Sequence, residues 1–170
     1  MKNLIAYFSH PGENYFAGSY KVIEEGNTKI IAKMINELVD ADMFEIDTVK
    51  KYSSGYKACC DEAMAEQRAG ELPELKSYLE NIDEYDNIIL CYPCWWGTCP
   101  QAVFTFLNHY DFNGKTIYPL CTHEGSGMGR SEGDIKRACP SANVQKGLAV
   151  QGSYVSSAKS TLESWLTNLK

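Results

Sequence analysis

Three loops in the sequence contain residue types that bind an anion or a flat ring. The first loop, residues 9–28, begins with Ser9 and ends with Asn27 and Thr28, where a helix is predicted to start. Hydroxyl groups, a side-chain amide and the free backbone N–H groups of a helix N-terminus bind phosphate well. Lys21 is the only Lys or Arg in this loop, so neutral donors would hold most of a phosphate. Simple helix capping is the plainer explanation of the same residues.

The second loop contains two adjacent tryptophans. It follows the apolar run 88–92 and includes residues 93–97 with the sequence PCWWG. Neighbouring side chains in an extended chain point to opposite sides, so at least one of Trp95 and Trp96 is difficult to bury. The pair predicts an aromatic wall for a flat ligand, and core packing beside a tight turn is the alternative.

The third loop, residues 122–129, is rich in glycine. Gly125, Gly127 and Gly129 fall within five residues, and each glycine costs backbone entropy on folding. That cost is easiest to explain if the main chain approaches a flat group or turns sharply, whereas a flexible surface loop is the simpler alternative. Together, the three loops predict a site for a phosphorylated planar heterocycle.

The elements that position these loops alternate between strands and helices. Apolar segments predict strands at 2–8, 43–46, 88–92, 116–121 and 144–150. Helices are predicted from residue 28, over 56–69, from 100, over 131–139 and from about 157, with a further apolar-faced piece after Pro73. This alternation predicts an α/β sheet with helices on both faces. Ligands bind such sheets beyond the carboxyl ends of the strands, which is where the three loops lie.

Composition narrows the class of protein. The chain has 170 residues, 44% hydrophobic and 22% charged, which suits a single globular domain over residues 1–170. The net charge of -6 argues against nucleic acid and is compatible with a basic protein partner. No apolar run approaches the roughly 20 residues of a membrane span. The N-terminal apolar run is too short for a signal peptide, so we expect a cytoplasmic protein.

The seven cysteines do not predict disulfides or a metal site. Their odd number fits a reducing compartment. Cys91 and Cys94 have redox-motif spacing, but Cys91 falls within a predicted buried strand rather than before a loop. No second Cys pair has zinc spacing. Both thioredoxin-like chemistry and metal binding are therefore disfavoured.

These loops resemble those of the flavodoxin family, and the resemblance covers essentially the whole chain. Residues 5–9 and 26–28 resemble the phosphate loop, residues 92–97 the first flavin loop and residues 121–127 the second flavin loop. The resemblance implies a three-layer α/β sandwich whose five-stranded parallel sheet has the order 2-1-3-4-5. It also implies non-covalent FMN and one-electron transfer.

The resemblance further implies which residues contact FMN. Ser9, Asn27 and Thr28 would bind the phosphate, Trp96 would stack on the ring and Trp95 would shield an edge. Gly97 would present a carbonyl that turns toward the reduced ring. The implied cofactor-binding set is Ser9, His10, Asn14, Asn27, Thr28, Pro93, Cys94, Trp95, Trp96, Gly97, Thr122, His123, Glu124, Gly125, Ser126 and Gly127. No catalytic residue and no metal ligand are implied.

Two features depart from the family pattern. Residues 11–25 interrupt the phosphate loop as a long polar loop, and their aromatic residues Tyr15, Phe16 and Tyr20 suggest a lid or an interface. The second flavin loop lacks the tyrosine that many members stack on the outer face of the flavin. His123 or Tyr154 could take its place.

The sequence leaves three functions open. A low-potential electron carrier fits the acidic chain and would dock on redox partner proteins with a basic surface. An FMN-dependent NAD(P)H:quinone or nitro-compound reductase would use the same loops and leave room above the flavin. An FMN-binding module without a redox partner is the third. NADPH oxidation by the purified protein with a quinone separates the enzyme from the carrier.

Overall fold

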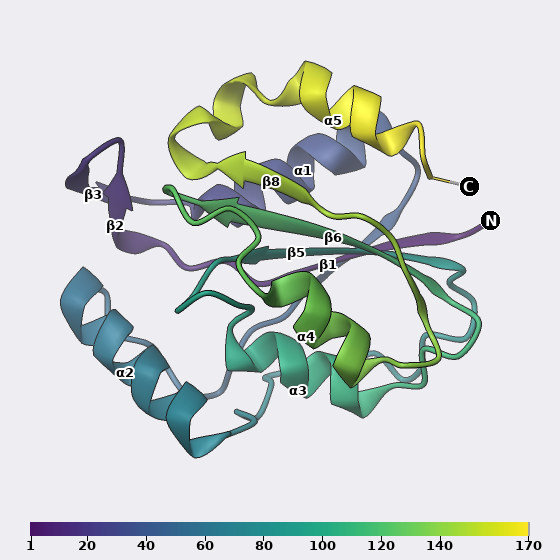
Figure 1. The fold of residues 1–170 in the computed structure, drawn as a ribbon, viewed down its shortest axis with the longest axis horizontal. Coiled ribbons are helices and arrows are strands. Elements are labelled where there is room, and N and C mark those ends of the chain that lie inside the picture. The colour runs from purple at the N-terminus through teal and green to yellow at the C-terminus, as the bar shows by residue number, and fades with distance from the viewer. Residues whose placement is uncertain (170) are drawn as a thin grey trace.

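The structure, a computed structural model, describes residues 1–169 and is built on one parallel sheet (Figure 1). The sheet has the order β4-β1-β5-β6-β7, and β8 also pairs with β6. Its strands are β1 (Asn3–Tyr7), β4 (Asp42–Glu45), β5 (Asn87–Pro93), β6 (Thr116–His123), β7 (Asn143–Val144) and β8 (Leu148–Gln151). All of its strand pairs are parallel. The predicted fold class is confirmed, with β7 and β8 together in the place of the fifth strand.

Helices cover both faces of this sheet (Figure 1). Strand β1 alternates, with Ile5 and Tyr7 packed in the core on one face and Leu4 and Ala6 in the core on the other. The first face carries α1 (Asn27–Leu38) and α5 (Lys159–Leu166), and the second carries α3 (Gln101–His109) and α4 (Ser131–Ala138). Strand β5 is buried from end to end apart from Pro93, as its unbroken apolar run predicts.

The fifth strand is broken in two because of a proline in its neighbour. The backbone oxygens of Lys115, just before β6, and of Ile117 in β6 accept hydrogen bonds from the backbone N–H groups of Asn143 and Gln145 at 2.8 and 2.9 Å. Pro119 is the next residue of β6 on that side, and it has no N–H to donate. Pairing therefore stops after Val144 and resumes in β8, where Leu148 lies opposite Leu120.

The segment predicted as a long polar loop is instead a β-hairpin. Strands β2 (Gly12–Phe16) and β3 (Ser19–Ile23) pair antiparallel and form a separate two-stranded sheet. The connecting residues Ala17 and Gly18 both have positive φ, 51° and 87°, which is the conformation that a two-residue hairpin turn requires. The loop prediction is wrong at this point because Ala17 carries no turn signal.

Helix α2 (Tyr56–Ala69) ends at Gly70, which adopts the left-handed conformation with φ 64°, so the predicted helix over 56–69 is confirmed. The further piece predicted after Pro73 does not form regular structure, although Leu75 and Ile82 are buried as its apolar face requires. A short 3-10 helix, η1 (Gly152–Ser157), follows β8. Within residues 1–169, no helix is both long enough and apolar enough to cross a membrane.

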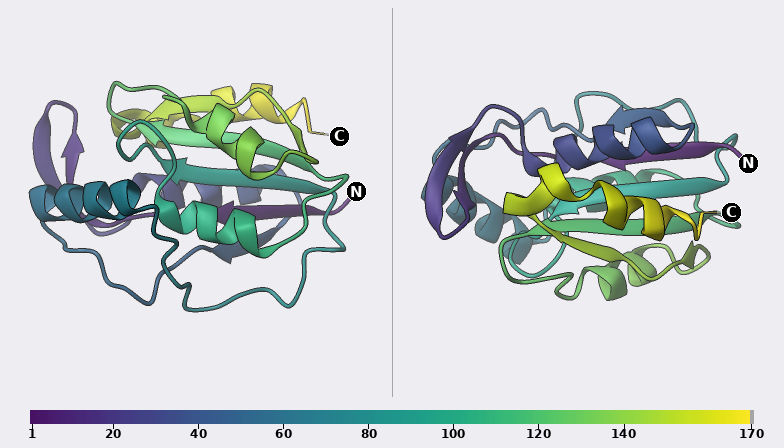
Figure 2. Two further views of the ribbon diagram at one scale, coloured as in Figure 1. Left: turned by 60° about the horizontal axis from the view of Figure 1, so that its bottom comes forward. Right: turned by 90° about the horizontal axis from the view of Figure 1, so that it is seen from above.

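The β2–β3 hairpin and α2 lie at the same end of the sheet (Figures 1 and 2). Both elements project beyond the carboxyl ends of the parallel strands. The hairpin comes from the connection after β1, and α2 comes from the long connection between β4 and β5. The end of the sheet that carries the three predicted ligand loops is therefore walled by two further elements.

Candidate functional site

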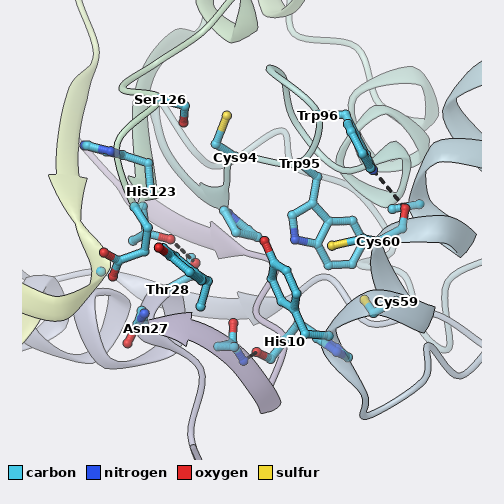
Figure 3. A pocket seen from close by; sticks show the side chains of 18 of the residues that line it. His10, Asn27, Thr28, Cys59, Cys60, Cys94, Trp95, Trp96, His123 and Ser126 are labelled. Atoms are coloured by element: carbon cyan, nitrogen blue, oxygen red, sulfur yellow. Dashed lines mark hydrogen bonds between the residues drawn. The ribbon is translucent and has the colours of Figure 1, made fainter. Parts of the chain in front are cut away.

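A cavity of about 330 Å³ opens at the carboxyl ends of β1, β5 and β6 (Figure 3). All three predicted loops contribute to its lining. Of the sixteen predicted residues, those that line it are His10, Asn14, Asn27, Thr28, Pro93, Cys94, Trp95, Trp96, Thr122, His123, Glu124 and Ser126. The remaining four, Ser9, Gly97, Gly125 and Gly127, are not among the lining residues.

Helix α1 points its N-terminus at the cavity, and Ser9 supports that end. The Ser9 hydroxyl accepts a hydrogen bond from the backbone N–H of Lys29 at 3.1 Å. The first N–H groups of any helix have no acceptor within the helix, and here they belong to Asn27 and Thr28, whose residues line the cavity. The two ends of the interrupted first loop therefore meet, and Ser9 acts on the helix rather than on the cavity.

The first loop offers neutral groups at this end. The ring nitrogen Nε2 of His10 lies 3.2 Å from the carbonyl oxygen of Ser53, and burial holds the pKa of His10 below its usual 6.5. The Asn14 amide donates to the carbonyl oxygens of His10 and Gly12, both at 3.2 Å. An uncharged His10 leaves the dipole of α1 as the attraction for an anion.

Side-chain hydrogen bonds tie the third loop to the rest of the site. The hydroxyls of Thr28 and Thr122 lie 2.8 Å apart and join α1 to the end of β6. The Glu124 carboxylate accepts a hydrogen bond from the backbone N–H of Ser153 at 2.7 Å and another from Gln151 at 3.2 Å. Glu124 therefore anchors the third loop to the start of η1.

His123 has a fixed tautomer at the rim of the cavity. The backbone N–H of Gly125 donates to its Nδ1 at 2.9 Å, so the ring proton of the neutral side chain is on Nε2. Gly125 itself has φ 132°, a conformation that glycine adopts without steric cost. The glycine allows the turn that aims its N–H at the ring, and its predicted contact with a ligand stays a prediction. Tyr154, the other candidate for the outer face, lies outside the lining and is exposed.

The two tryptophans are presented by a tight two-residue turn. Trp96 and Gly97 have φ of 52° and 79°, and the backbone groups of Trp95 and Thr98 hydrogen-bond each other at 2.9 and 3.3 Å. Two successive positive φ values define the turn type that suits a hairpin. A tryptophan in this conformation costs about 1 kcal/mol, so the surrounding contacts must hold it there.

The turn separates the environments of the two rings (Figure 3). Trp95 packs edge-on against Phe8 and Tyr52, each with ring centroids 5.1 Å away. Trp96 is 45% exposed, and its indole N–H donates to the carbonyl oxygen of Cys60 in α2 at 2.8 Å. Both rings line the cavity, and the predicted stacking role of Trp96 and edge role of Trp95 stay predictions.

Arg130 holds the turn from behind. Its guanidinium donates to the carbonyl oxygen of Trp96 at 3.1 Å, and its backbone N–H donates to the carbonyl oxygen of Gly97 at 2.8 Å. Asp134 pairs with the same guanidinium at 3.5 Å. The Gly97 carbonyl, which was predicted to turn toward the ring, therefore faces the start of α4 and must first break this hydrogen bond.

One part of the lining was not predicted from the sequence. It comprises Glu13 and Tyr15 from β2, Tyr56, Cys59, Cys60 and Ala63 from α2, and Gly152 from η1. The four α2 residues have the spacing i, i+3, i+4 and i+7, which is a single helix face. The sequence shows this spacing, and it could have identified the four residues as one helix face. It does not show which part of the fold that face contacts.

Cys94 has an unusual environment for a thiol. It lines the cavity, and hydrogen bonding from the Cys121 thiol, followed by the Ser126 hydroxyl, lowers the pKa of Cys94 to about 6. The pKa of Cys121 changes in the opposite direction, because the same hydrogen bond and burial raise it. The pKa of Cys94 is therefore lower than that of an ordinary thiol, so its thiolate forms at a lower pH.

We expect the alkylation rate of Cys94 by iodoacetamide to rise with pH around a midpoint of about 6, because the thiolate is the reactive form. Mass spectrometry of peptides gives the rate for each cysteine separately. Cys60 lines the same cavity, and burial raises the pKa of its thiol, so it serves as the internal control with a much later midpoint. A Cys94 midpoint near that of Cys60 would contradict the assigned hydrogen bonding.

Comparison with known proteins identifies the family. Residues 2–169 match the family model described as flavodoxin. The chain belongs to the flavodoxin family. A search of curated proteins found no match to this flavodoxin-family chain.

Solved structures agree with the family assignment of this flavodoxin. A protein of Bacteroides uniformis assigned as a flavoprotein shares 28% identity and a TM-score of 0.77, over 98% of this chain and 97% of that one. One of Bacteroides eggerthii, also assigned as a flavoprotein, shares 26% identity and a TM-score of 0.77, over 99% and 97%. A flavoprotein of Lactobacillus acidophilus in complex with FMN shares the fold, with 20% identity and a TM-score of 0.65, over 92% and 97%.

The residues present fit a flavin cofactor. The free N–H groups of α1 suit a phosphate, and the tryptophan turn suits a flat ring. A Cβ added at Gly26 would lie 2.1 Å from the Ser9 hydroxyl oxygen, and one at Gly152 would lie 2.4 Å from the Asn27 amide nitrogen. Glycine at both positions leaves space at the α1 end of the cavity. Ser9 can then accept the hydrogen bond from Lys29, and Asn27 can line the cavity.

Proposed function

We propose that this flavodoxin binds FMN in the cavity and transfers electrons at low potential between partner proteins. The observation that carries the proposal is that the N-terminus of α1 and the tryptophan turn open into one cavity at the carboxyl ends of the strands. The flavoprotein of Lactobacillus acidophilus, solved with FMN, supports FMN among the flavins.

Different residues of the chain would bind different parts of FMN. The N–H groups of Asn27 and Thr28, with the dipole of α1, would bind the phosphate. Trp95 and Trp96 would cover the ring and exclude water from it. The backbone of residues 122–127 would border the polar edge of the ring. FMN would supply the redox chemistry, and the protein would tune it.

The charges around the cavity favour a low reduction potential. Glu13 and Glu124 line it, and none of its lining residues is Lys or Arg. Negative charge and a low dielectric both oppose the gain of an electron by the bound group. A net charge of -6 would also steer the protein toward partners with a basic surface, at a rate that falls as salt rises.

Comparing FMN with riboflavin tests the phosphate site directly, because riboflavin lacks only the phosphate. We expect FMN to bind about 100-fold more tightly, since charge-assisted hydrogen bonds to a helix N-terminus are worth about 3 kcal/mol together. Titration of flavin-free protein, followed by flavin fluorescence, measures both dissociation constants. Equal affinities would show that the protein does not bind the phosphate group of FMN. Failure to bind either flavin would overturn the proposed function.

Steady-state assays distinguish the carrier from a reductase. With NADPH and a quinone but no second protein, we expect negligible NADPH oxidation by the FMN-loaded protein. Addition of a flavodoxin reductase should restore electron flow, and the rate should fall as sodium chloride is raised. Rapid NADPH oxidation by the protein alone would instead support the FMN-dependent reductase.

A further inference from the structure

Helix α2 carries two glutamates, one turn apart, that face the chain segment 50–53. Glu62 and Glu66 have the spacing i, i+4, which places them on the same side of the helix. The side chain of Glu66 is only 1% exposed, and a buried carboxylate costs free energy unless it is hydrogen-bonded or paired. Neither glutamate lines the cavity, so the proposed assignments for FMN do not explain them.

The Glu66 carboxylate holds the side chain of Tyr52. The Tyr52 hydroxyl donates to it at 2.5 Å, and the ammonium group of Lys50 pairs with it at 3.0 Å. Burial, followed by this hydrogen bond to Glu66, raises the pKa of Tyr52 well above its usual 10. The phenol therefore keeps its proton and remains the donor. The outer end of the Tyr52 ring is fixed to α2 by a hydrogen bond to a charged acceptor.

The ring of Tyr52 in turn packs against two residues that line the cavity, Trp95 and His10 (Figure 3). Its centroid lies 5.1 Å from that of Trp95 and 6.3 Å from that of His10, and both contacts are edge-on. The rings of His10 and Trp95 also meet edge-on, with centroids 5.8 Å apart. Tyr52 itself is not a lining residue. Because edge-on pairs have a preferred geometry, a shift of Tyr52 would move both lining rings.

Further hydrogen bonds connect α2 to the same two lining residues. The backbone N–H of Ser53 donates to the Glu62 carboxylate at 3.2 Å, and the Ser53 hydroxyl donates to the same group. The carbonyl oxygen of Ser53 lies 3.2 Å from Nε2 of His10. The Gln67 side chain donates to the carbonyl oxygen of Trp95 at 3.4 Å. Helix α2 therefore reaches His10 and Trp95 through their rings and through polar groups.

We propose that Tyr52 and Glu66 are positioning residues for the flavin ring. Glu66 fixes Tyr52, and Tyr52 holds Trp95 and His10 in the arrangement that receives the ring. Apolar residues of similar volume would pack α2 equally well, so the direction given to the Tyr52 ring is the specific contribution of the buried hydrogen bond. The proposal rests on the proposed function, because Trp95 acts on a flavin only if one binds in the cavity.

Tyr52→Phe tests the proposal with FMN and riboflavin as a pair of ligands. The variant keeps the ring and removes the donor to Glu66. We expect both flavins to bind about tenfold more weakly, and by the same factor, because the ring end of the cavity changes while the phosphate end does not. Fluorescence titration of flavin-free protein measures both dissociation constants.

Tyr85→Phe is the matched control for this substitution. The Tyr85 hydroxyl also donates to a carboxylate, that of Asp42, at 2.7 Å. Asp42 begins β4 and Tyr85 precedes β5, so this hydrogen bond lies at the amino ends of the parallel strands, away from the cavity. The same loss of a hydroxyl should leave the affinity for both flavins unchanged there.

Variants of Glu66 separate positioning from stability. Glu66→Gln keeps an acceptor for the Tyr52 hydroxyl and should retain flavin affinity to within about threefold, whereas Glu66→Leu should lose about tenfold. Combining Glu66→Leu with Tyr52→Phe removes both partners, so urea unfolding should show less destabilisation than the sum of the two single changes. Flavin affinity should nevertheless stay low in the double variant. The visible circular dichroism of saturating flavin, which reports on the groups around the ring, should change in Tyr52→Phe and Glu66→Leu and not in Glu66→Gln.

Two results would overturn the positioning role while the proposed function stands. The first is wild-type riboflavin affinity and flavin dichroism in Tyr52→Phe and Glu66→Leu, because the hydrogen bond would then only stabilise the packing of α2. The second is a loss confined to FMN, since the effect would then lie at the phosphate end. Failure of the wild-type protein to bind either flavin would instead overturn the proposed function itself. If Glu66→Leu does not fold, the contrast between Tyr52→Phe and Glu66→Gln decides the question.

Discussion

Replacing Gly26 with alanine is expected to weaken FMN binding about 100-fold. Gly26 is the residue before α1, and an added Cβ would lie 2.1 Å from the Ser9 hydroxyl oxygen and 3.0 Å from the backbone nitrogen of His10. Its φ of -64° suits alanine, so the effect comes from contact and not from backbone strain. Ser9 would be forced off the N–H of Lys29, and the phosphate end of the cavity would lose its shape, at a cost of about 3 kcal/mol in binding.

Gly55→Ala is the matched control for this change. Gly55 occupies the same position before α2, with φ -73°, and an added Cβ there would meet no atom within 4 Å. Both variants share the cost of up to about 1 kcal/mol for alanine at a helix N-cap. The difference between them in FMN dissociation constant, measured by fluorescence titration, therefore isolates the contact with Ser9. Equal affinities would show that Gly26 does not shape the phosphate end.

The second large effect is expected at Gly129, which supports the tryptophan turn. An added Cβ would lie 2.2 Å from the carbonyl oxygen of Gly97, the same oxygen that accepts the N–H of Arg130 at 2.8 Å. The left-handed φ of 54° at Gly129 adds strain for alanine. We expect Gly129→Ala to lower the free energy of unfolding by about 3 kcal/mol and to displace Trp96 from the cavity.

Gly127→Ala separates strain from contact in the same loop. Gly127 has a similar φ of 64°, but an added Cβ would meet nothing within 4 Å. Its expected cost is therefore only the left-handed conformation, about 1 kcal/mol. Urea unfolding of both variants gives the two free energies, and tryptophan emission reports on Trp96. If the two variants lose the same stability, backbone strain and not the close approach to Gly97 explains the loss in Gly129→Ala.

Local patterns in the sequence predicted most of the fold correctly. The unbroken apolar run at 88–92 predicts a strand buried on both faces, and β5 is such a strand. Gly70 predicts the end of α2, because glycine adopts the left-handed conformation at a helix end. These features depend on residues close together in the chain, so the sequence displays them directly.

The features that the sequence did not reveal depend on distant residues or on unusual ones. The break between β7 and β8 comes from Pro119 in the neighbouring strand, and its effect appears only once the strands are paired. The β2–β3 hairpin turns at Ala17, which has φ 51° in place of the usual asparagine or glycine. In both cases the ordinary propensity of a residue is overridden by its partners.

The sequence predicted which residues belong to the candidate site more accurately than it predicted what each of them does there. The four predicted residues outside the lining, Ser9, Gly97, Gly125 and Gly127, all belong to turns or hydrogen bonds that support it. A motif shows that a residue belongs to the site. It does not show whether that residue contacts a ligand or supports a neighbouring residue. The α2 residues of the lining were missed because the sequence shows the helix face to which they belong but not the element that this face meets.

The proline that breaks the fifth strand also affects how this sheet ends. An exposed edge strand offers unpaired N–H and C=O groups to which a strand of another chain can add. On one edge the sheet ends in the four-residue β4, and on the other it ends in β7 and β8, which Pro119 separates. Neither edge of the described sheet is a long regular strand. The break at Pro119 thus also disfavours edge-to-edge association of this flavodoxin with copies of itself.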